Sequence, residues 1–391
     1  MLNTPFSPWP CFTEEEREAV SRVLASNRVN YWTGDEGRKF ESEFADWVGV
    51  KHAVALSNGT VALELALRAL DISVGEEVIV TPRSFFGSAS SIVAVGASPV
   101  FADVDWNSQN ITADTIRAQL TDKTRAVICV HLAGMPCDME PIQSLAAEHD
   151  LKIIEDCAQA HGAEYRGKKI GGIGHVAAWS FCQDKIMTTG GEGGMITTND
   201  DELWSRAWSL KDHGKSWDAV YNRKHPPGFR WLHDSFGTNA RMLEMQAVIG
   251  RIQLRRMPEW SSRRMENASR LAAACSKHAV VRIPEVPEDC THAYYRFYVF
   301  VRPEQLAAEW DRDRIVEEIV ARGVPCYQGA CPEIYREKAF INSGFRQPSR
   351  CPTARELGET GMMFLVHPTL TDAEIERSCE VLGEVLALAG K

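Results

Sequence analysis

A lysine with an unusual setting lies near the middle of the chain. Lys185 follows the apolar run at 176–181, and the glycine-rich stretch GGEGG at 190–194 comes just before another apolar run. Most lysines are solvated, which remains an alternative here. A lysine that forms a Schiff base is instead partly buried, and apolar or cationic surroundings then lower its pKa. Because glycines let the backbone turn sharply beside a bulky group, this setting makes Lys185 a candidate nucleophile.

Small residues follow a second apolar run, at 53–57. The segment Ser57-Asn58-Gly59-Thr60 opens a predicted helix. Small residues at a helix N-terminus leave backbone N–H groups free to bind a phosphate, and the helix dipole favours the negative charge. A plain helix cap is the alternative interpretation.

An acid and an aromatic residue follow two further apolar runs. Asp156 comes directly after the run LKIIE, where a buried carboxylate is costly unless it has a partner such as a protonated pyridine nitrogen. Gln159 follows three residues later and could donate to a ring oxygen. Phe85 lies in the turn after EVIVT, where it could stack on a flat ring. A helix cap and a core aromatic are the respective alternatives.

Short apolar runs alternate with helical patterns over residues 53–200. Strand–helix alternation of this kind predicts an α/β fold with a mostly parallel, seven-stranded sheet covered by helices on both faces. The predicted strands are 53–57, 77–81, 99–103, 125–131, 151–155, 176–181 and 194–198, with helices at 59–70 and 138–149 among others. Ligands of such sheets bind at the carboxyl ends of the strands, where the residues above lie.

The second part of the chain has a different pattern. A helical stretch at about 239–279, which we expect to be interrupted near Pro258, precedes an alternating strand at 293–301. A helix at 310–321, a short strand near 324–328 and a last helix with a capping box formed by Thr371 and Glu374 complete it. We therefore predict two domains, a large α/β domain at 1–255 and a small α+β domain at 256–391.

These features together predict a cofactor. A phosphate cradle, an aromatic ring, an acid and a lysine follow successive strands of one sheet, and pyridoxal 5′-phosphate (PLP) needs all four. We therefore expect Lys185 and Asp156 to be catalytic residues of a PLP enzyme.

The chain resembles the DegT/StrS family of PLP-dependent sugar aminotransferases, which have the aspartate aminotransferase fold (fold type I). The likeness runs from about residue 10 to 255. It is carried by SNGTVALELAL (57–67), IIEDCAQAHGAEYRGKKIG (153–171), SFCQDKIMTTGGEGGMITTND (180–200) and FGTNARMLEMQAVIGRIQL (236–254).

The resemblance implies a role for each matching position. Lys185 would form the Schiff base, Asp156 would pair with the pyridine nitrogen, Gln159 would contact the ring hydroxyl, and Phe85 would cover the ring. Gly59, Thr60 and Ser180 would hold the phosphate. Asn239 would reach the phosphate from the other subunit of a homodimer, and Arg241 would bind a carboxylate or the phosphates of the substrate.

Other positions could contact the substrate. Thr33, beside Trp32 and Gly34, could line the entrance, and Tyr327 and His367 could reach in, although packed core residues are an equal alternative for the last two. His161 could support the site from behind.

The sequence departs from the family pattern in three places. Ala240 replaces a usual aromatic, and the loop after Lys185 has one glycine more than some members. Arg83 also replaces a usual aromatic, and it could be either an anion contact or a surface charge.

Composition limits the remaining possibilities. The chain has 391 residues, a formal net charge of −10 and 11 scattered cysteines without a CxxC motif. An acidic chain without a basic run argues against nucleic-acid binding, and the cysteine pattern predicts neither a metal site nor a disulfide framework. No signal peptide or apolar run of membrane-spanning length is present, so we expect a cytoplasmic protein with no membrane partner.

The favoured function is transfer of an amino group from L-glutamate to a nucleotide-linked keto-sugar, in cell-surface glycan or secondary-metabolite biosynthesis. Lys185 supports this interpretation, because relatives that carry histidine there remove a hydroxyl group instead. One alternative is a non-nucleotide cyclic ketone, of the inosose or aminoshikimate type. An alternative of another class is a PLP-binding regulatory protein without catalysis. The nucleotide, the sugar and the position aminated, C3 or C4, are not determined by the sequence.

Overall fold

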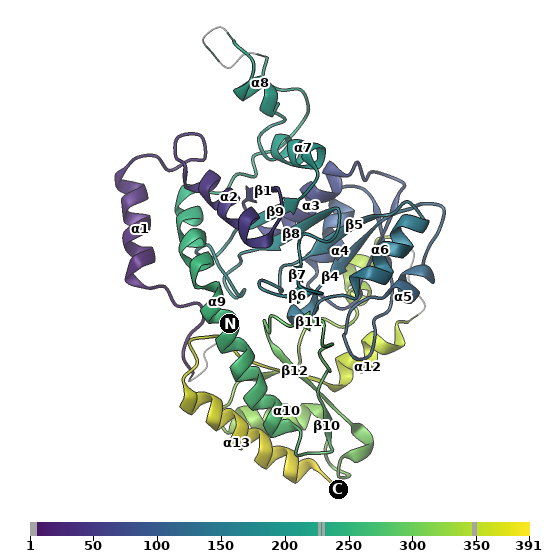
Figure 1. The fold of residues 1–391 in the computed structure, drawn as a ribbon. Helices are drawn as coiled ribbons and strands as arrows, with labels where there is room; N and C mark the ends of the chain where they lie inside the picture. Colours follow the sequence, from purple (N-terminus) through teal and green to yellow (C-terminus); the bar gives the residue numbers. More distant parts are fainter. Residues whose placement is uncertain (1–5, 226–227, 229–230, 346–349) are drawn as a thin grey trace.

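A seven-stranded sheet forms the centre of the N-terminal part of the chain (Figure 1). The computed structural model describes residues 6–225, 228, 231–345 and 350–391. The strand order is β1-β9-β8-β5-β4-β2-β3; β9 runs antiparallel to β1 and β8, and the other neighbouring pairs are parallel. The strands are β1 (His52–Leu56), β2 (Glu77–Val80), β3 (Ser98–Phe101), β4 (Thr124–Val130), β5 (Lys152–Asp156), β8 (Val176–Ser180) and β9 (Gly194–Thr198). The predicted mostly parallel seven-stranded sheet is thus confirmed.

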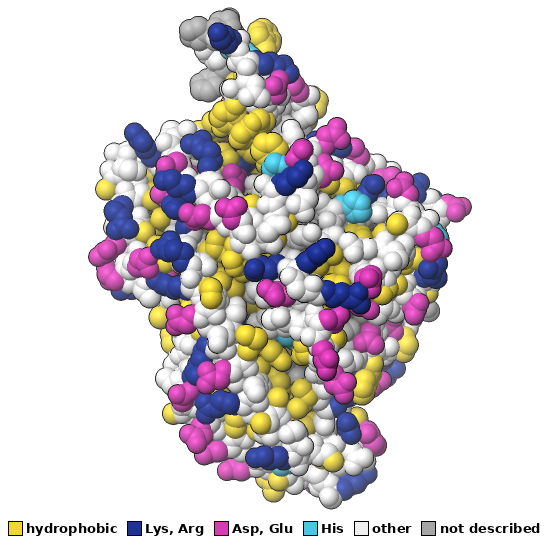
Figure 2. All heavy atoms as spheres, viewed as in Figure 1, with side chains coloured by type: hydrophobic (Ala, Val, Ile, Leu, Met, Phe, Trp, Pro, Cys, Tyr) yellow, Lys and Arg dark blue, Asp and Glu magenta, His cyan; other side chains and the backbone are white. Residues whose placement is uncertain are grey.

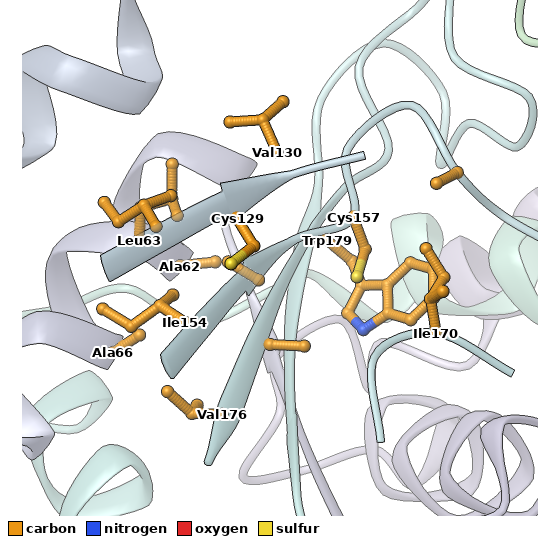
Figure 3. Close-up of a cluster of buried hydrophobic side chains, with 14 of the residues drawn as sticks. Ala62, Leu63, Ala66, Cys129, Val130, Ile154, Cys157, Ile170, Val176 and Trp179 are labelled. Carbon is orange, nitrogen blue, oxygen red and sulfur yellow. The ribbon is translucent and has the colours of Figure 1, made fainter. Parts of the chain in front are cut away.

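Both faces of this sheet are covered. Almost every residue of the central strands is buried whichever face it points to, as expected for strands packed on both sides. Ala62, Leu63 and Ala66 lie on one side of the strands, and Trp179 and Ile170 lie on the other (Figure 3). The helices of this part are α1 (Glu14–Ala25), α2 (Glu36–Val48), α3 (Gly59–Ala69), α4 (Gly87–Ala94), α5 (Ala113–Arg117), α6 (Met139–Glu148), α7 (Asp201–Lys211) and α8 (Trp217–Tyr221).

A smaller antiparallel sheet lies in the C-terminal part. Its order is β10-β12-β14-β13, with β10 (Val281–Arg282), β12 (Phe297–Val301), β13 (Cys326–Tyr327) and β14 (Gly361–Phe364). The helices are α10 (Arg312–Ala321), α11 (Lys338–Ile341), α12 (Pro352–Thr360) and α13 (Asp372–Ala389), and the predicted capping box opens α13. A third sheet, of β6 (Glu164–Tyr165), β7 (Lys168–Lys169) and β11 (Cys290–Thr291), joins the two parts and was not predicted.

One long helix, α9 (Glu244–Cys275), connects the two parts. Pro258 lies inside it, so the prediction that the helix is interrupted there was wrong. A proline removes one backbone hydrogen bond, but α9 packs against α1, α2 and α13, and this burial keeps the helix continuous. The predicted boundary after residue 255 lies within α9, and the division into two domains stays a prediction.

The surface is mixed in charge. On the face in Figure 2, acidic and basic side chains are interspersed instead of gathering by sign. Residues 213–225, 228 and 231–238, called the arm below, project from the body around α8 (Figure 1). Among the described residues, no helix combines the length and the apolar character that crossing a bilayer requires.

Helix α9 approaches α2 closely at Gly250, which allows a direct test of the packing. A Cβ atom at Gly250 would lie 2.5 Å from the buried Phe40 ring, so we expect Gly250→Ala to lower the free energy of unfolding by about 1–3 kcal/mol. Gly383 in α13 is the matched control, because its nearest neighbour is 3.7 Å away. Gly383→Ala should raise stability by about 0.5–1 kcal/mol, as alanine normally does within a helix. Denaturant unfolding measures both changes, and destabilisation of equal size in the two variants would contradict the packing argument.

Candidate active site

The strand register places the predicted site residues on one face of the sheet. Asp156 ends β5 and Ser180 ends β8, and the pairing of Asp156 with Ala178 puts both side chains on the same face. Helix α3, which begins at Gly59, packs against β8. The carboxyl ends of two strands and the amino end of a helix therefore meet, as the sequence predicted.

Small residues allow this close approach. A Cβ atom at Gly59 would lie 2.6 Å from Cβ of Ser180, and one at Gly87 would lie 3.2 Å from Oγ1 of Thr60. Asn58 accepts the N–H of Val61 at 2.9 Å, and the first N–H groups of a helix have no partner within it. The amino ends of α3 and α4 and the Ser180 hydroxyl thus surround one small space that is lined by hydrogen-bond donors.

The carboxyl group of Asp156 is buried and only partly satisfied. Ser88 Oγ donates to Oδ2 at 2.7 Å, and the N–H of Ala158 donates to Oδ1 at 3.1 Å. Burial raises the pKa of Asp156, although both hydrogen bonds favour the ionised form. Ser88 was not predicted, because a serine one turn after Phe85 carries no local signal of this contact.

Lys185 is buried except for 14% of its side chain. Its Nζ lies 4.0 Å from Oδ1 of Asp184 and 5.0 Å from the centre of the Tyr295 ring. Burial favours the neutral amine, but the electronegative groups around it, Tyr295, Asp184, Cys182 and Asp156, outweigh burial and raise the pKa of Lys185. The predicted lowering of this pKa was therefore wrong, because apolar and cationic neighbours do not dominate the surroundings.

Phe85 and Gln159 lie at the same edge of the sheet. The Phe85 ring is 68% exposed, and a Cβ atom at Gly87 would lie 3.1 Å from it, so the ring borders the space beside Thr60. Gln159 accepts the N–H of Ala133 through Oε1 at 2.8 Å, which leaves its NH₂ group as a donor. The predicted roles of both residues stay predictions.

Asn239 and Arg241 run beside the end of β1, where the N–H of Ser57 donates to Ala240 at 2.9 Å. The Ala240 side chain is buried and Asn239 is exposed. The Arg241 guanidinium pairs with Asp212 at 2.8 Å. Asp212 orients the guanidinium, and the role of Arg241 as an anion contact stays a prediction.

The buried Asp212 joins several residues at this position. Trp32 Nε1 donates to its Oδ2 at 2.8 Å, and Lys215 Nζ lies 3.1 Å from its Oδ1. Thr33, next to Trp32, is exposed and donates its hydroxyl to the carbonyl of Asn30 at 3.2 Å. The predicted entrance residues are therefore close to the Arg241 pair in space.

The C-terminal candidates are His367 and Tyr327. His367 is buried, stacks on Trp9 at 5.8 Å and shares a hydrogen bond with Thr369. Burial lowers the pKa of His367 to about 3, so this ring is neutral. Tyr327 is half-buried in β13. In the described part of the chain, no hydrogen bond or ion pair links Thr33, Tyr327 or His367 directly to Lys185 or Asp156, although Trp9 donates to the Lys185 carbonyl at 2.8 Å.

The sequence left the environments of two buried side chains, Arg83 and His161, open. Arg83 is fully buried, and its Nε and Nη2 donate to Gln109 at 3.3 and 3.1 Å, so its interpretation as a surface charge was wrong. His161 packs between Trp179 and Phe181, and neither ring nitrogen has a partner among the described residues. Burial lowers the pKa of His161 to about 3, which keeps this ring neutral beside Lys185.

One buried cluster of three residues has the residue types of a metal site, but its carboxylate and its imidazole already have hydrogen-bond partners. His131, Glu155 and Cys157 place their ligand atoms within 4.8 Å of one another. Glu155 accepts the N–H groups of Gly171, Ile173 and Gly174 as well as His131, whose Nδ1 accepts the N–H of Cys137. The cluster therefore holds the loop at 171–174 against the sheet through hydrogen bonds.

The residues present fit PLP. The cradle at Gly59, Thr60 and Ser180 offers donors to a phosphate, the exposed Phe85 offers a ring face, and the partly satisfied carboxyl of Asp156 can take a cationic partner. Lys185 supplies the amine. With PLP bound, this set supports amino-group transfer chemistry.

Comparisons with known proteins identify the family. The DegT/DnrJ/EryC1/StrS aminotransferase family model matches residues 10–383. GDP-perosamine synthase of Escherichia coli O157:H7 is 34% identical over 378 residues, which cover 96% of each chain. UDP-N-acetyl-3-dehydro-alpha-D-glucosamine 3-aminotransferase of Acidithiobacillus ferrooxidans is 35% identical and covers 98% of this chain and 96% of its own.

A solved structure agrees with this result. The aminotransferase from Psychrobacter cryohalolentis is 58% identical and superposes with a TM-score of 0.96, covering 98% of this chain and 99% of its own. PLP is the cofactor of this family, and one structural neighbour is known in its PLP form. The chain therefore belongs to the DegT/DnrJ/EryC1/StrS aminotransferase family and is a PLP-dependent aminotransferase.

Proposed function

We propose that this enzyme transfers the amino group of L-glutamate to a nucleotide-linked keto-sugar in the cytoplasm. The observation that carries the proposal is that the Lys185 amine and the Asp156 carboxyl are near enough to influence each other's pKa, at strand ends that also carry the phosphate cradle. The two curated relatives described above act on nucleotide sugars by name, and they differ in the nucleotide. A nucleotide-linked acceptor is therefore favoured over a free cyclic ketone, while the nucleotide itself stays open.

The residues of the site divide the chemistry between them. Bound PLP supplies a ring that withdraws electrons from the carbon that carries the amino group. Lys185 Nζ would be the base that removes the proton from this carbon and returns it to C4′ of the cofactor. Asp156, held by Ser88, keeps the proton on the ring nitrogen. Glutamate leaves as 2-oxoglutarate and the keto group becomes an amine, so no external oxidant is needed.

A homodimer with shared sites is part of the proposal. Asn239 is exposed at the base of the arm, where Trp231 and Phe236 are 85% and 94% exposed. Large exposed aromatic side chains are typical of surfaces that a partner covers. This arrangement supports the prediction that Asn239 completes the phosphate site of the other subunit.

The first test concerns the cofactor and the donor. Purified protein loaded with PLP should be yellow, and L-glutamate should bleach the colour; the correct keto-sugar should then restore it. Lys185→Ala should bind PLP weakly without transamination, whereas Lys168→Ala, at an exposed lysine, should behave as the wild type. Visible absorbance follows each step. Substantial turnover by Lys185→Ala would refute the assigned role, and a holoenzyme that ignores glutamate would point to another donor.

The second test concerns Ser88. Removing a hydrogen bond to a charged group costs about 1.5–3 kcal/mol, so Ser88→Ala should weaken PLP binding about 10- to 100-fold. It should also raise the pKa of Asp156, because the lost bond favours the ionised form. Loss of PLP binding on the acid side should therefore begin at a higher pH. Ser91→Ala, also buried in α4, is the control, and equal effects of both variants in PLP titrations would show that Ser88 acts only through helix packing.

The third test uses two defective subunits. Lys185→Ala and Asn239→Ala should each be inactive or impaired as pure dimers. If Asn239 completes the site of the other subunit, a hybrid dimer regains one intact site, so random one-to-one mixing should restore about a quarter of the wild-type activity. No recovery after verified subunit exchange would place Asn239 in the site of its own subunit instead.

A further inference from the structure

The residue before the lysine has an environment that no catalytic role described so far uses. Asp184 Oδ1 lies 4.0 Å from Lys185 Nζ, and its Oδ2 accepts the Tyr295 hydroxyl at 2.5 Å. Arg296 Nη2 lies 3.6 Å from the same Oδ2. One carboxylate therefore faces the catalytic amine on one side and two groups of the C-terminal part on the other.

The segment that carries these two groups is fixed to the N-terminal sheet. The N–H groups of Ala293 and Tyr295 donate to Gly134 and Ala133, both at 2.9 Å. Gly134 has a φ of 98° that favours glycine, and a Cβ atom there would lie 2.9 Å from Cβ of Ala293. Tyr295 therefore reaches Asp184 from a rigid backbone position. The N–H of Ala133 also donates to Gln159 at 2.8 Å, so the same loop contacts two parts of the site.

Charge and burial give each partner a distinct effect. Burial raises the pKa of Tyr295, and the Asp184 carboxylate adds to this, so at neutral pH the phenol is a protonated donor and carries no charge. Burial alone would raise the pKa of Asp184, but Lys185, Tyr295 and Arg296 outweigh it and keep this group ionised. The Tyr295 hydrogen bond therefore helps to keep the Asp184 carboxylate charged beside the lysine.

We propose that Asp184, held by Tyr295 and Arg296, is a positioning residue that sets the proton affinity of the free Lys185 amine. The inference rests on the proposed aminotransferase chemistry, in which this amine must alternate between charged and neutral forms. Asp184 favours the ammonium form, and Tyr295 supports that effect, because its hydrogen bond keeps the carboxylate ionised. Among the described residues, further titratable or charged groups that face this centre are Asp156 from β5, Cys182 from the same loop, His161 from the loop after β5 and Arg264 from α9.

The pH dependence of PLP capture tests the proposal without substrate turnover. Full-length protein freed of cofactor is mixed with PLP over a pH series, and the rise of visible absorbance gives the capture rate. Only the neutral amine reacts, so the rate reports the proton affinity of Lys185. Asp184→Asn should lower the apparent pKa by about one unit, which is about a tenfold faster capture below that pKa.

Tyr295→Phe should shift the profile in the same direction as Asp184→Asn. Without the hydroxyl, Lys185 loses an electronegative neighbour and Asp184 loses a donor that favours its ionised form, so the apparent pKa should fall. Glu192→Gln is the control, because it removes an exposed carboxylate of the same loop. Among the described residues, the hydrogen-bond partner of this carboxylate is Cys182. This variant should reproduce the wild-type profile.

The outcomes separate this proposal from the function on which it rests. A lower apparent pKa in both Asp184→Asn and Tyr295→Phe, with an unchanged profile in Glu192→Gln, would support it. A raised or unchanged apparent pKa in Tyr295→Phe would overturn it even if Asp184→Asn did not fold. A wild-type holoenzyme that glutamate fails to bleach would refute the proposed donor, whatever the capture profiles show.

Discussion

The burial of one incompletely satisfied carboxyl group, that of Asp156, is the constraint on which the arrangement of the site depends. An ionised carboxylate inside a protein is costly unless donors or a cation surround it. Ser88 and the N–H of Ala158 supply two donors, and burial still raises the pKa of the group. A protonated ring nitrogen would supply the missing partner. The end of β5 is therefore suited to binding a cofactor.

The preceding residue shows what a purely structural acid looks like in the same strand. Glu155 points to the opposite face of the sheet and accepts three backbone N–H groups and His131. Burial would raise its pKa, but these partners outweigh burial and lower it. Two adjacent buried acids thus have pKa values displaced in opposite directions. Both carboxyl groups are buried, but Glu155 has more hydrogen-bond donors than Asp156. Glu155 therefore holds a loop, whereas Asp156 is available for chemistry.

Local sequence was sufficient for the features that depend on period and strand ends. The short apolar runs predicted all seven strands of the large sheet, and Asp156 and Lys185 were candidates because of their positions after those strands. The role of Ser180 was implied by the family resemblance. Contacts between distant segments were not accessible in this way. Tyr295 reaches Asp184 across 111 positions of sequence, and Ser88 reaches Asp156 across 68. The continuity of α9 through Pro258 and the burial of Arg83 likewise depend on packing that no local pattern encodes.

The substrate side of the site was harder to predict for a related reason. Threonine, tyrosine and histidine occur in every kind of environment, so Thr33, Tyr327 and His367 could not be assigned from residue type. Arg241 shows that an ion pair complicates the prediction of a role even for an arginine within a family motif. Its guanidinium and Lys215 both face the single carboxylate of Asp212, so two positive charges oppose one negative charge. Pairing with Asp212 therefore orients Arg241 without cancelling the positive charge at the end of β1.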